Sequence, residues 1–353
     1  MRMRGVNFGG WFSQIDAIQE KDPASFPGES EHMRTFLGAD DFRRVREWGF
    51  DHVRLPVDWQ NVFDAGIRPV EGTLSLLDRA VDGILAQGLR VILDLHKCPG
   101  HDFHSGATEK QAFFADPALR GDCLRVWSVL GERYGHREGV LLELLNEPVA
   151  PDAATWNAVK DELAAHIRGI APKATLVVGS NLWNNSSEFE HLTPVDDDNI
   201  LYSVHLYNPI VFTHQKAPWI AHPLFQETRS YPGTYEIPDD GGSRLPVDGG
   251  RWDRDRMYRH LEPVFRFREI HGVQVACNEF GAYMGGPTRA DRIAWMTDVL
   301  DLFREHGIGW SYWNYRNLDF GLVSRGESLF ANSPNYDDPE RIDREMLALL
   351  RSR

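Results

Sequence analysis

Eight short apolar segments recur along this chain of 353 residues, and most are followed by a stretch with helical periodicity. Most of the segments lack the alternation of apolar and polar residues that marks a half-exposed strand. They are therefore typical of strands buried on both faces of a parallel sheet. The segments are Arg4–Phe8, Phe50–Leu55, Arg90–His96, Val140–Asn146, Thr175–Gly179, Ile200–Tyr207, Val273–Glu279 and Ile308–Trp313. Eight strand–helix units in a chain of this length predict a single (β/α)8 barrel, the TIM barrel.

Helix-boundary residues stand between the segments where such a barrel requires them. Thr288 and Asp152 are expected N-caps, and Asp116 precedes a proline at the first helical position. Glycines that can end a helix precede three segments: Gly88, Gly272 and Gly307. A last helix is expected near Arg341–Leu350. A doubly wound sheet is the alternative fold, but no glycine-rich phosphate loop follows the first segment.

No linker-like composition divides the chain, so we expect one domain over residues 1–353. Three of the expected strand-to-helix loops are long for a compact domain, and a barrel places such loops on its catalytic face. They are Gly9–Ala39, Lys97–Asp116 and Asn208–Trp252. The third loop carries several aromatic residues among prolines and glycines, a composition that can order against the barrel rim and wall off part of a site.

Charge and cysteine usage restrict the class of partner and the compartment. The formal net charge of −14 and the lack of basic patches argue against a nucleic-acid partner. No apolar run is long enough for a membrane helix, and no signal-type stretch follows Met1. The three cysteines have no metal-ligand spacing, and Cys277 is most simply a core residue. We expect a cytoplasmic protein, or a secreted one if a leader has been removed. The sequence leaves the oligomeric state open.

Two segments end abruptly in a glutamate. Leu144–Pro148 contains Asn146 and Glu147, and Cys277–Gly281 contains Glu279. The C-terminal end of a barrel strand opens on the active-site face, and two carboxyl groups there are what hydrolysis of a glycosidic bond requires. Either motif alone could be a strand-to-helix turn with a capping side chain. Their joint occurrence on the fourth and seventh strands favours catalysis.

Other polar or aromatic residues also stand at strand ends and should converge on the same site. They are Arg54, His96, Asn146, His205, Tyr207 and Trp313. Each has a structural alternative, because Arg54 could form a surface ion pair and the histidines could be buried core residues. Either Trp313 or Trp310 is expected to pack in the barrel.

Three tryptophans follow strands in loop positions: Trp11, Trp59 and Trp183. If exposed, they would provide stacking platforms for sugar rings, but such residues serve equally often as loop anchors.

Histidines at positions 96, 101 and 104, with Asp94 and Asp102, raise the alternative of a metal site. Their spacing matches no zinc pattern, and Pro99 and Gly100 place the last two histidines on a loop. We therefore expect no metal and no other cofactor.

The ordered set of strand-end motifs resembles glycoside hydrolase family five, the cellulase and mannanase family. The matching residues are Arg54 in His52–Pro56, His96 in Asp94–His96, Asn146 with Glu147 and Pro148, His205 with Tyr207, Glu279 and Trp313. They extend from the second to the eighth strand, so the resemblance covers essentially the whole chain. No catalytic position is missing. The departures lie in the long loops, which puts the substrate in doubt rather than the chemistry.

The resemblance implies a retaining mechanism, with Glu279 as nucleophile and Glu147 as acid/base. It implies that Arg54 and Tyr207 favour ionised Glu279 by lowering its pKa, and that His205 orients Glu147. It also implies that Asn146 binds the 2-hydroxyl of the cleaved sugar, that His96 contacts another hydroxyl and that Trp313 forms the floor of this subsite.

The sequence therefore predicts a retaining hydrolase of β-linked, gluco- or manno-configured oligosaccharides or glycoconjugates. An open-cleft endo-β-1,4-glucanase acting on polymer is the alternative within this class. A barrel that binds carbohydrate without turnover is the alternative of another class, and a metal-dependent hydrolase is a third. The sugar, the linkage and the choice between exo and endo action stay open at this stage.

Overall fold

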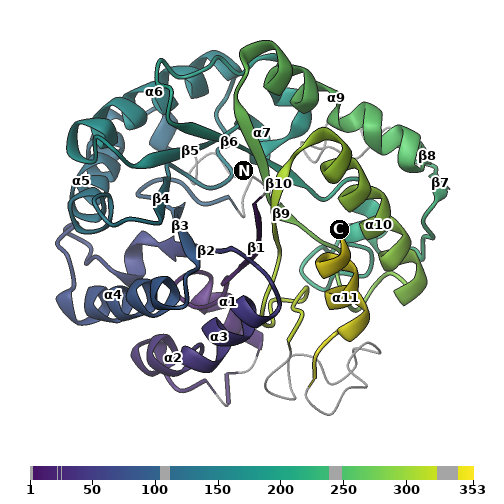
Figure 1. Cartoon of the computed structure of the whole chain (residues 1–353), viewed down its shortest axis with the longest axis horizontal. Helices are drawn as coiled ribbons and strands as arrows, with labels where there is room; N and C mark the ends of the chain where they lie inside the picture. Colours follow the sequence, from purple (N-terminus) through teal and green to yellow (C-terminus); the bar gives the residue numbers. More distant parts are fainter. Residues whose placement is uncertain (1–2, 22, 25, 104–111, 238–248, 324–340) are drawn as a thin grey trace.

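Eight parallel strands close into a barrel in the order β1-β10-β9-β6-β5-β4-β3-β2, and helices surround it (Figure 1). The barrel strands are β1 (Arg4–Asn7), β2 (His52–Asp58), β3 (Arg90–Lys97), β4 (Val140–Glu143), β5 (Thr175–Gly179), β6 (Ile200–Leu206), β9 (Gln274–Phe280) and β10 (Gly309–Tyr312). All eight predicted strands are present, and the TIM-barrel prediction is confirmed. The doubly wound alternative is excluded because the sheet is closed.

This computed structural model describes residues 3–21, 23–24, 26–103, 112–237, 249–323 and 341–353. The helices are α1 (Ile15–Lys21), α2 (Glu29–Thr35), α3 (Ala39–Glu47), α4 (Glu71–Ala86), α5 (Pro117–Tyr134), α6 (Ala153–Ile170), α7 (Asn181–Asn184), α8 (Ile210–Thr213), α9 (Arg254–His271), α10 (Arg289–His306) and α11 (Arg344–Ser352). Short 3-10 helices are η1 (Trp59–Asn61), η3 (Ser186–Glu190) and η4 (Pro223–Phe225). In the described part of the chain, none of the helices is long and apolar enough to cross a membrane.

The expected helix boundaries are largely confirmed. The side chains of Asp116, Asp152 and Thr288 accept hydrogen bonds from backbone N–H groups in the first turns of α5, α6 and α10. Gly272 and Gly307 end their helices in the left-handed conformation, with φ of 64° and 66°. Glycine adopts this conformation with little strain because it has no Cβ atom.

Most strand boundaries differ from the prediction by one to three residues, and two differences have a visible local cause. The last helix begins at Arg344 rather than Arg341, because the Asp343 side chain accepts from the Met346 N–H and caps the helix there. The fourth strand ends at Glu143 rather than Asn146. Beyond it the chain bonds to the two neighbouring strands in turn, first from Leu144 N to Val177 O and then from Asn146 N to Leu95 O.

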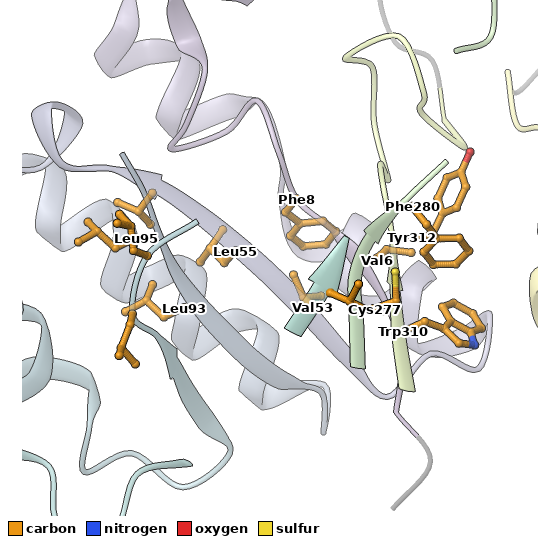
Figure 2. Packing of buried hydrophobic residues seen from close by; sticks show 14 of the residues in the cluster. Val6, Phe8, Val53, Leu55, Leu93, Leu95, Cys277, Phe280, Trp310 and Tyr312 are labelled. Carbon is orange, nitrogen blue, oxygen red and sulfur yellow. The ribbon is translucent and has the colours of Figure 1, made fainter. Parts of the chain in front are cut away.

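Strand periodicity separates the two faces of the barrel wall. Val53 and Leu55 of β2, and Leu93 and Leu95 of β3, pack in the main core between strands and helices (Figure 2). Cys277 lies in the same core, as expected. Ile92 instead belongs to a small apolar cluster with the residues at the starts of other barrel strands. Alternation along a strand then places the side chains of Arg54, Asp94 and His96 inside the barrel.

Short elements order the long loops. Helices α1 and α2 occupy the first loop, and α8, η4 and the antiparallel pair β7 (Gly233–Tyr235) and β8 (Gly250–Trp252) occupy the third. Tyr231 fixes the third loop to α10, since its hydroxyl lies 2.9 Å from the Asp298 carboxylate and its N–H donates to Asp291. The second loop includes residues 104–111, which lie outside the described ranges.

Candidate active site

Seven of the eight residues singled out from the sequence stand at or just beyond the C-terminal ends of barrel strands, whereas Arg54 lies in the middle of β2, which extends to Asp58. Arg54, His96, His205 and Glu279 lie within β2, β3, β6 and β9. The other four follow strand ends: Asn146 and Glu147 after β4, Tyr207 after β6 and Trp313 after β10. All except Tyr207 are buried, and Tyr207 is partly exposed. The barrel thus brings side chains from six strands to one end.

The two glutamates face each other across a short gap. Ligand-type atoms of Glu147, His205 and Glu279, one from each, all lie within 4.8 Å of one another. His205 Nδ1 is 2.9 Å from Glu147 Oε1 and 3.7 Å from Glu279 Oε2. Glu147 itself has a φ of 44°, a conformation that non-glycine residues adopt rarely and that occurs most often at functional positions.

Arg54 is the centre of a buried ion network. One guanidinium nitrogen donates to Glu279 Oε1 at 2.6 Å. Two others hold the carboxylate of Glu143 at 2.7 and 3.0 Å, in the bidentate geometry that suits arginine. Nη2 also donates to Asn146 Oδ1 at 2.8 Å and lies 2.9 Å from Asp94 Oδ2. The alternative of a surface ion pair for Arg54 is therefore wrong.

Glu143 was not predicted from the sequence as a site residue, and Asp94 was expected only as a possible metal ligand or as part of the His96 motif. Both side chains are fully buried around Arg54. Burial raises the pKa of each to about 7, against the opposing effect of the Arg54 charge. The available signal was strand periodicity, because Asp94 precedes His96 by two residues and therefore shares its face.

Burial raises the pKa of Glu147 well above its usual value, and the negative charge of Glu279 raises it further. Burial lowers the pKa of His205 well below its usual value, with the Arg54 charge acting in the same direction. Both shifts favour the uncharged forms of the two groups, whose Nδ1 and Oε1 atoms lie 2.9 Å apart.

Arg54 and Tyr207 act on Glu279 in the expected direction, because the Arg54 charge and the hydrogen bond from the Tyr207 hydroxyl at 2.9 Å both lower its pKa. Burial outweighs them, so the net pKa of Glu279 is raised from its usual value. Arg54 and Tyr207 donate hydrogen bonds to Glu279, and both donors favour its ionised form.

Two residues flank the glutamates with flat rings. The His96 and Trp313 rings are nearly parallel, at an interplanar angle of 4° and a centroid distance of 5.8 Å. His96 Nδ1 is 2.7 Å from Asp94 Oδ2, which fixes the ring. Trp310 packs instead against Phe50 and Phe280 in the core, so it is the tryptophan that fills the barrel wall.

A cavity of about 600 Å³ opens above these groups. Six of the predicted residues line it: His96, Glu147, His205, Tyr207, Glu279 and Trp313. Arg54 and Asn146 lie beneath them and are fully buried. Asn146 Nδ2 is buried without a hydrogen-bond partner among the described residues, as is His205 Nε2. A second cavity of about 940 Å³ lies at the opposite end, among the first residues of the strands.

Two close carboxyl groups, one of which accepts hydrogen bonds from an arginine and a tyrosine, in a cavity with aromatic walls match the pair that glycosidases use to hydrolyse glycosidic bonds. Residues 18–319 match the family model described as cellulase, glycosyl hydrolase family 5. The chain belongs to glycosyl hydrolase family 5. It is therefore a glycoside hydrolase, and the resemblance drawn from its strand-end motifs is confirmed.

Relatives of known name cover nearly the whole chain. Endoglucanase C from Acetivibrio thermocellus is 33% identical over 332 residues, which cover 91% of this chain and 93% of that protein. Cellodextrinase A from Ruminococcus flavefaciens is 28% identical over 309 residues, covering 87% and 83%. The structure of Thermotoga maritima Cel5A in complex with mannotriose has a TM-score of 0.74 at 22% identity, covering 99% of this chain and 97% of that one. This last likeness supports the barrel fold.

In this family 5 chain, one of the loop tryptophans anchors its loop and another lines the cavity, where a stacking platform was expected. Trp11 is buried, and its Nε1 donates to the Met33 carbonyl at 2.8 Å, so it anchors its loop. Trp59 is partly buried against the main core. Trp183 lines the cavity. Trp219 of the third loop also lines it and is 47% exposed; its aromatic character was the only signal in the sequence.

The histidines considered for a metal have other partners. His96 pairs with Asp94, and His101 Nε2 lies 3.2 Å from the Asn146 carbonyl oxygen. His104 lies outside the described residues. Within the described ranges, the three side chains whose spacing could hold a metal ion are Glu147, His205 and Glu279 themselves. Metal-independent activity therefore stays a prediction.

Proposed function

We propose that this family 5 enzyme hydrolyses β-linked gluco- or manno-configured saccharides with retention, by double displacement. The observation that carries the proposal is the short gap between the two carboxyl groups, since one oxygen of Glu147 and one of Glu279 lie within 4.8 Å of each other. Retaining glycosidases hold their carboxyl groups about 5–5.5 Å apart, whereas inverting enzymes need about 6.5–9.5 Å to admit a water molecule.

In the first step, Glu279 attacks the anomeric carbon and Glu147 protonates the departing oxygen. Arg54 and Tyr207 hold the Glu279 carboxylate by its two oxygens, at 2.6 and 2.9 Å, and aim it. Burial raises the pKa of the Tyr207 hydroxyl, so this donor keeps its proton. Glu147 enters the step protonated for the reasons of burial and repulsion given above.

In the second step, Glu147 must accept a proton from water. Formation of the glycosyl ester removes the negative charge of Glu279, which is one of the causes of the raised pKa of Glu147. The pKa of Glu147 therefore falls in the intermediate, and the same carboxyl can act as base. His205 Nδ1, 2.9 Å from Glu147 Oε1, keeps the carboxyl in position in both steps.

The remaining residues are proposed to bind the sugar at the cleaved bond. Asn146 Nδ2 has no hydrogen-bond partner among the residues that the structure describes and is the donor for the 2-hydroxyl, because Arg54 occupies Oδ1. His96 contacts another hydroxyl, and Trp313 forms the floor. No cofactor takes part in these steps.

Paired amide substitutions test the two carboxyl roles. Glu279→Gln should reduce turnover by several orders of magnitude while leaving the fold intact. Glu147→Gln should be most damaging on substrates with a poor leaving group, because an activated phenol departs without protonation. More than a tenth of wild-type activity in Glu279→Gln, or equal damage of Glu147→Gln on both substrate types in the glycosylation step, would contradict the assignment. Absence of reducing-sugar release from every β-glycoside tested would favour the non-catalytic binding barrel.

We further propose a short, partly closed site that acts on soluble oligosaccharides or glycoconjugates. Support comes from the third loop, where Phe225, Tyr231, Tyr235 and Trp252 are buried while Trp219 reaches the cavity. The second candidate is an open cleft acting on polymer, favoured by the name endoglucanase of the relative described above. Hydrolysis of a β-linked trisaccharide should exceed that of the matching soluble polymer; faster polymer cleavage with a rapid fall in viscosity would select the open cleft.

A further inference from the structure

Glu143 holds Arg54 by one complete edge of its guanidinium group. Nε and Nη2 of Arg54 donate to the two carboxylate oxygens of Glu143 at 2.7 and 3.0 Å. A guanidinium is planar and its N–H groups have fixed directions, so a contact through two nitrogens fixes its rotation. Asp94 and Asn146 contact one of these nitrogens, Nη2. The orientation of the Arg54 plane is therefore set mainly by Glu143.

The remaining nitrogen of Arg54 carries the hydrogen bond to the proposed nucleophile. Nη1 donates to Glu279 Oε1 at 2.6 Å and to Asn7 Oδ1 at 3.0 Å. Because the guanidinium is rigid, the direction of Nη1 follows from the way in which Glu143 holds the opposite edge. Glu143 thus determines, through Arg54, where one oxygen of Glu279 is held.

A second connection runs through the residue that precedes Glu279. The register between β6 and β9 skips Asn278, because consecutive residues of β6 pair with Cys277 and Glu279. Asn278 Nδ2 donates to Glu143 Oε2 at 3.2 Å. Asn278 Oδ1 is buried without a hydrogen-bond partner in the described part of the chain, so the bond to Glu143 orients this amide. A closed ring results, formed by Glu143, Arg54, Glu279 and Asn278.

Glu143 and Asn278 lie beneath the cavity and do not line it. Both side chains are fully buried, whereas Glu279 reaches the cavity. Stability alone does not account for a carboxylate between the buried residues Leu142 and Leu144, because apolar residues in place of a buried ion pair are often neutral or stabilising. The effect of Glu143 on the position of Glu279 does account for it.

We propose that Glu143 and Asn278 are positioning residues for Glu279. Glu143 aims Arg54 at one oxygen of the Glu279 carboxylate, and Asn278 ties the adjoining backbone of β9 into the same ring. The proposal rests on the function proposed above, in which Glu279 attacks the anomeric carbon. Since neither residue touches the sugar, losing either should slow the attack without weakening substrate binding. Displacing a reacting group by about 1 Å lowers a rate about 100-fold.

The test measures the attack itself. A dinitrophenyl 2-deoxy-2-fluoro β-glycoside, of the sugar that the wild type hydrolyses best, forms a long-lived ester whose accumulation is followed by intact mass spectrometry. Glu143→Gln places an NH2 group against an Arg54 donor and should lower the maximal labelling rate about 100-fold. Asn278→Leu should lower it about 10-fold and covers the case in which Glu143→Gln does not fold. The half-saturating reagent concentration should stay within about twofold of wild type.

A double variant tests whether the two residues act as one unit. Glu143→Gln combined with Asn278→Leu should label no more than about threefold more slowly than Glu143→Gln alone, because the ring is already open. Independent effects would multiply to a fall of about 1000-fold. Asp343→Asn is the matched control, since Asp343 is a buried carboxylate that lies 3.3 Å from the buried Arg292. It should lose stability and label at the wild-type rate.

Labelling at the wild-type rate in both single variants would overturn the proposal, and so would an equal slowing in Asp343→Asn. A fall that comes from a higher half-saturating concentration would assign the two residues to substrate binding and would also overturn it. Multiplicative effects in the double variant would overturn the shared action. Failure of the proposed function is distinct, because the wild type itself would then form no ester at Glu279.

Discussion

Replacing Arg54 with methionine should alter both the stability and the pH dependence of this enzyme. The guanidinium is fully buried and contacts the carboxylates of Asp94, Glu143 and Glu279. Removing one partner of a buried ion pair costs about 3–5 kcal/mol, because the other is left uncompensated. The unfolding entropy of a 353-residue chain is roughly 0.7 kcal/mol/K. The melting temperature should therefore fall by roughly 4–7 °C.

The effect on the rate follows from Glu279. A cation in contact with a carboxylate lowers its pKa by about 1–3 units, and this contribution disappears with Arg54. The pKa of Glu279, already raised by burial, should rise further. The acidic limb of the kcat/KM profile, which reports the essential base of the free enzyme, should move up by about 1–3 pH units. At pH values below the wild-type acidic limb, activity should fall roughly 10- to 1000-fold, and it should recover in part at higher pH.

The assay is kcat/KM on an activated β-glycoside from pH 4.5 to 9, with thermal unfolding followed by circular dichroism. Arg292→Met is the matched control, because Arg292 is equally buried and pairs with Asp343. It should lose comparable stability without moving the acidic limb. An Arg54→Met enzyme whose acidic limb stays at the wild-type pH, or a control that shifts the limb as much, would refute the reasoning.

Three further outcomes are expected. Burial raises the pKa of Glu143 to about 7, so the folded protein binds more protons than the unfolded chain from about pH 4.5 to 7, and its free energy of unfolding decreases as pH rises through this range. In urea titrations, the loss of unfolding free energy between pH 5 and 8 should be about 1–3 kcal/mol smaller in Glu143→Gln than in the wild type. Parallel curves of unfolding free energy against pH for the two proteins would speak against this expectation. Activity should survive prolonged chelation, and stoichiometric metal whose removal abolishes activity would reverse that expectation. Calorimetry should show one cooperative transition for residues 1–353, as one domain requires, whereas two separated transitions would argue for two domains.

The strands and the site positions could be predicted because the same short-range pattern encodes both. Buried apolar runs mark the strands, and the residue at which each run stops marks the catalytic face, so Arg54, Glu147 and Glu279 could be located without a structure. Caps such as Asp152 and Thr288 are equally local. The start of α11 was misplaced by three residues because its cap, Asp343, stands inside the predicted helix.

What could not be predicted depends on contacts between distant segments. Glu143 lies within an apolar run, and only barrel closure places it against Arg54, 89 residues away in sequence. The direction of the Glu279 pKa shift depends on how far burial outweighs two hydrogen bonds. The consecutive residues His96 and Lys97 both line the cavity, and this depends on a shift in the register between β2 and β3.

The anomeric configuration of the first-formed product tests the double-displacement account most directly. Proton NMR, recorded during hydrolysis of a β-linked oligosaccharide before mutarotation, resolves the α and β anomers of the newly released reducing end. The separation of Glu147 and Glu279 predicts that the β anomer appears first and the α anomer only later, as mutarotation proceeds. Initial appearance of the α anomer would mean inversion and would contradict the assignment of Glu279 as nucleophile.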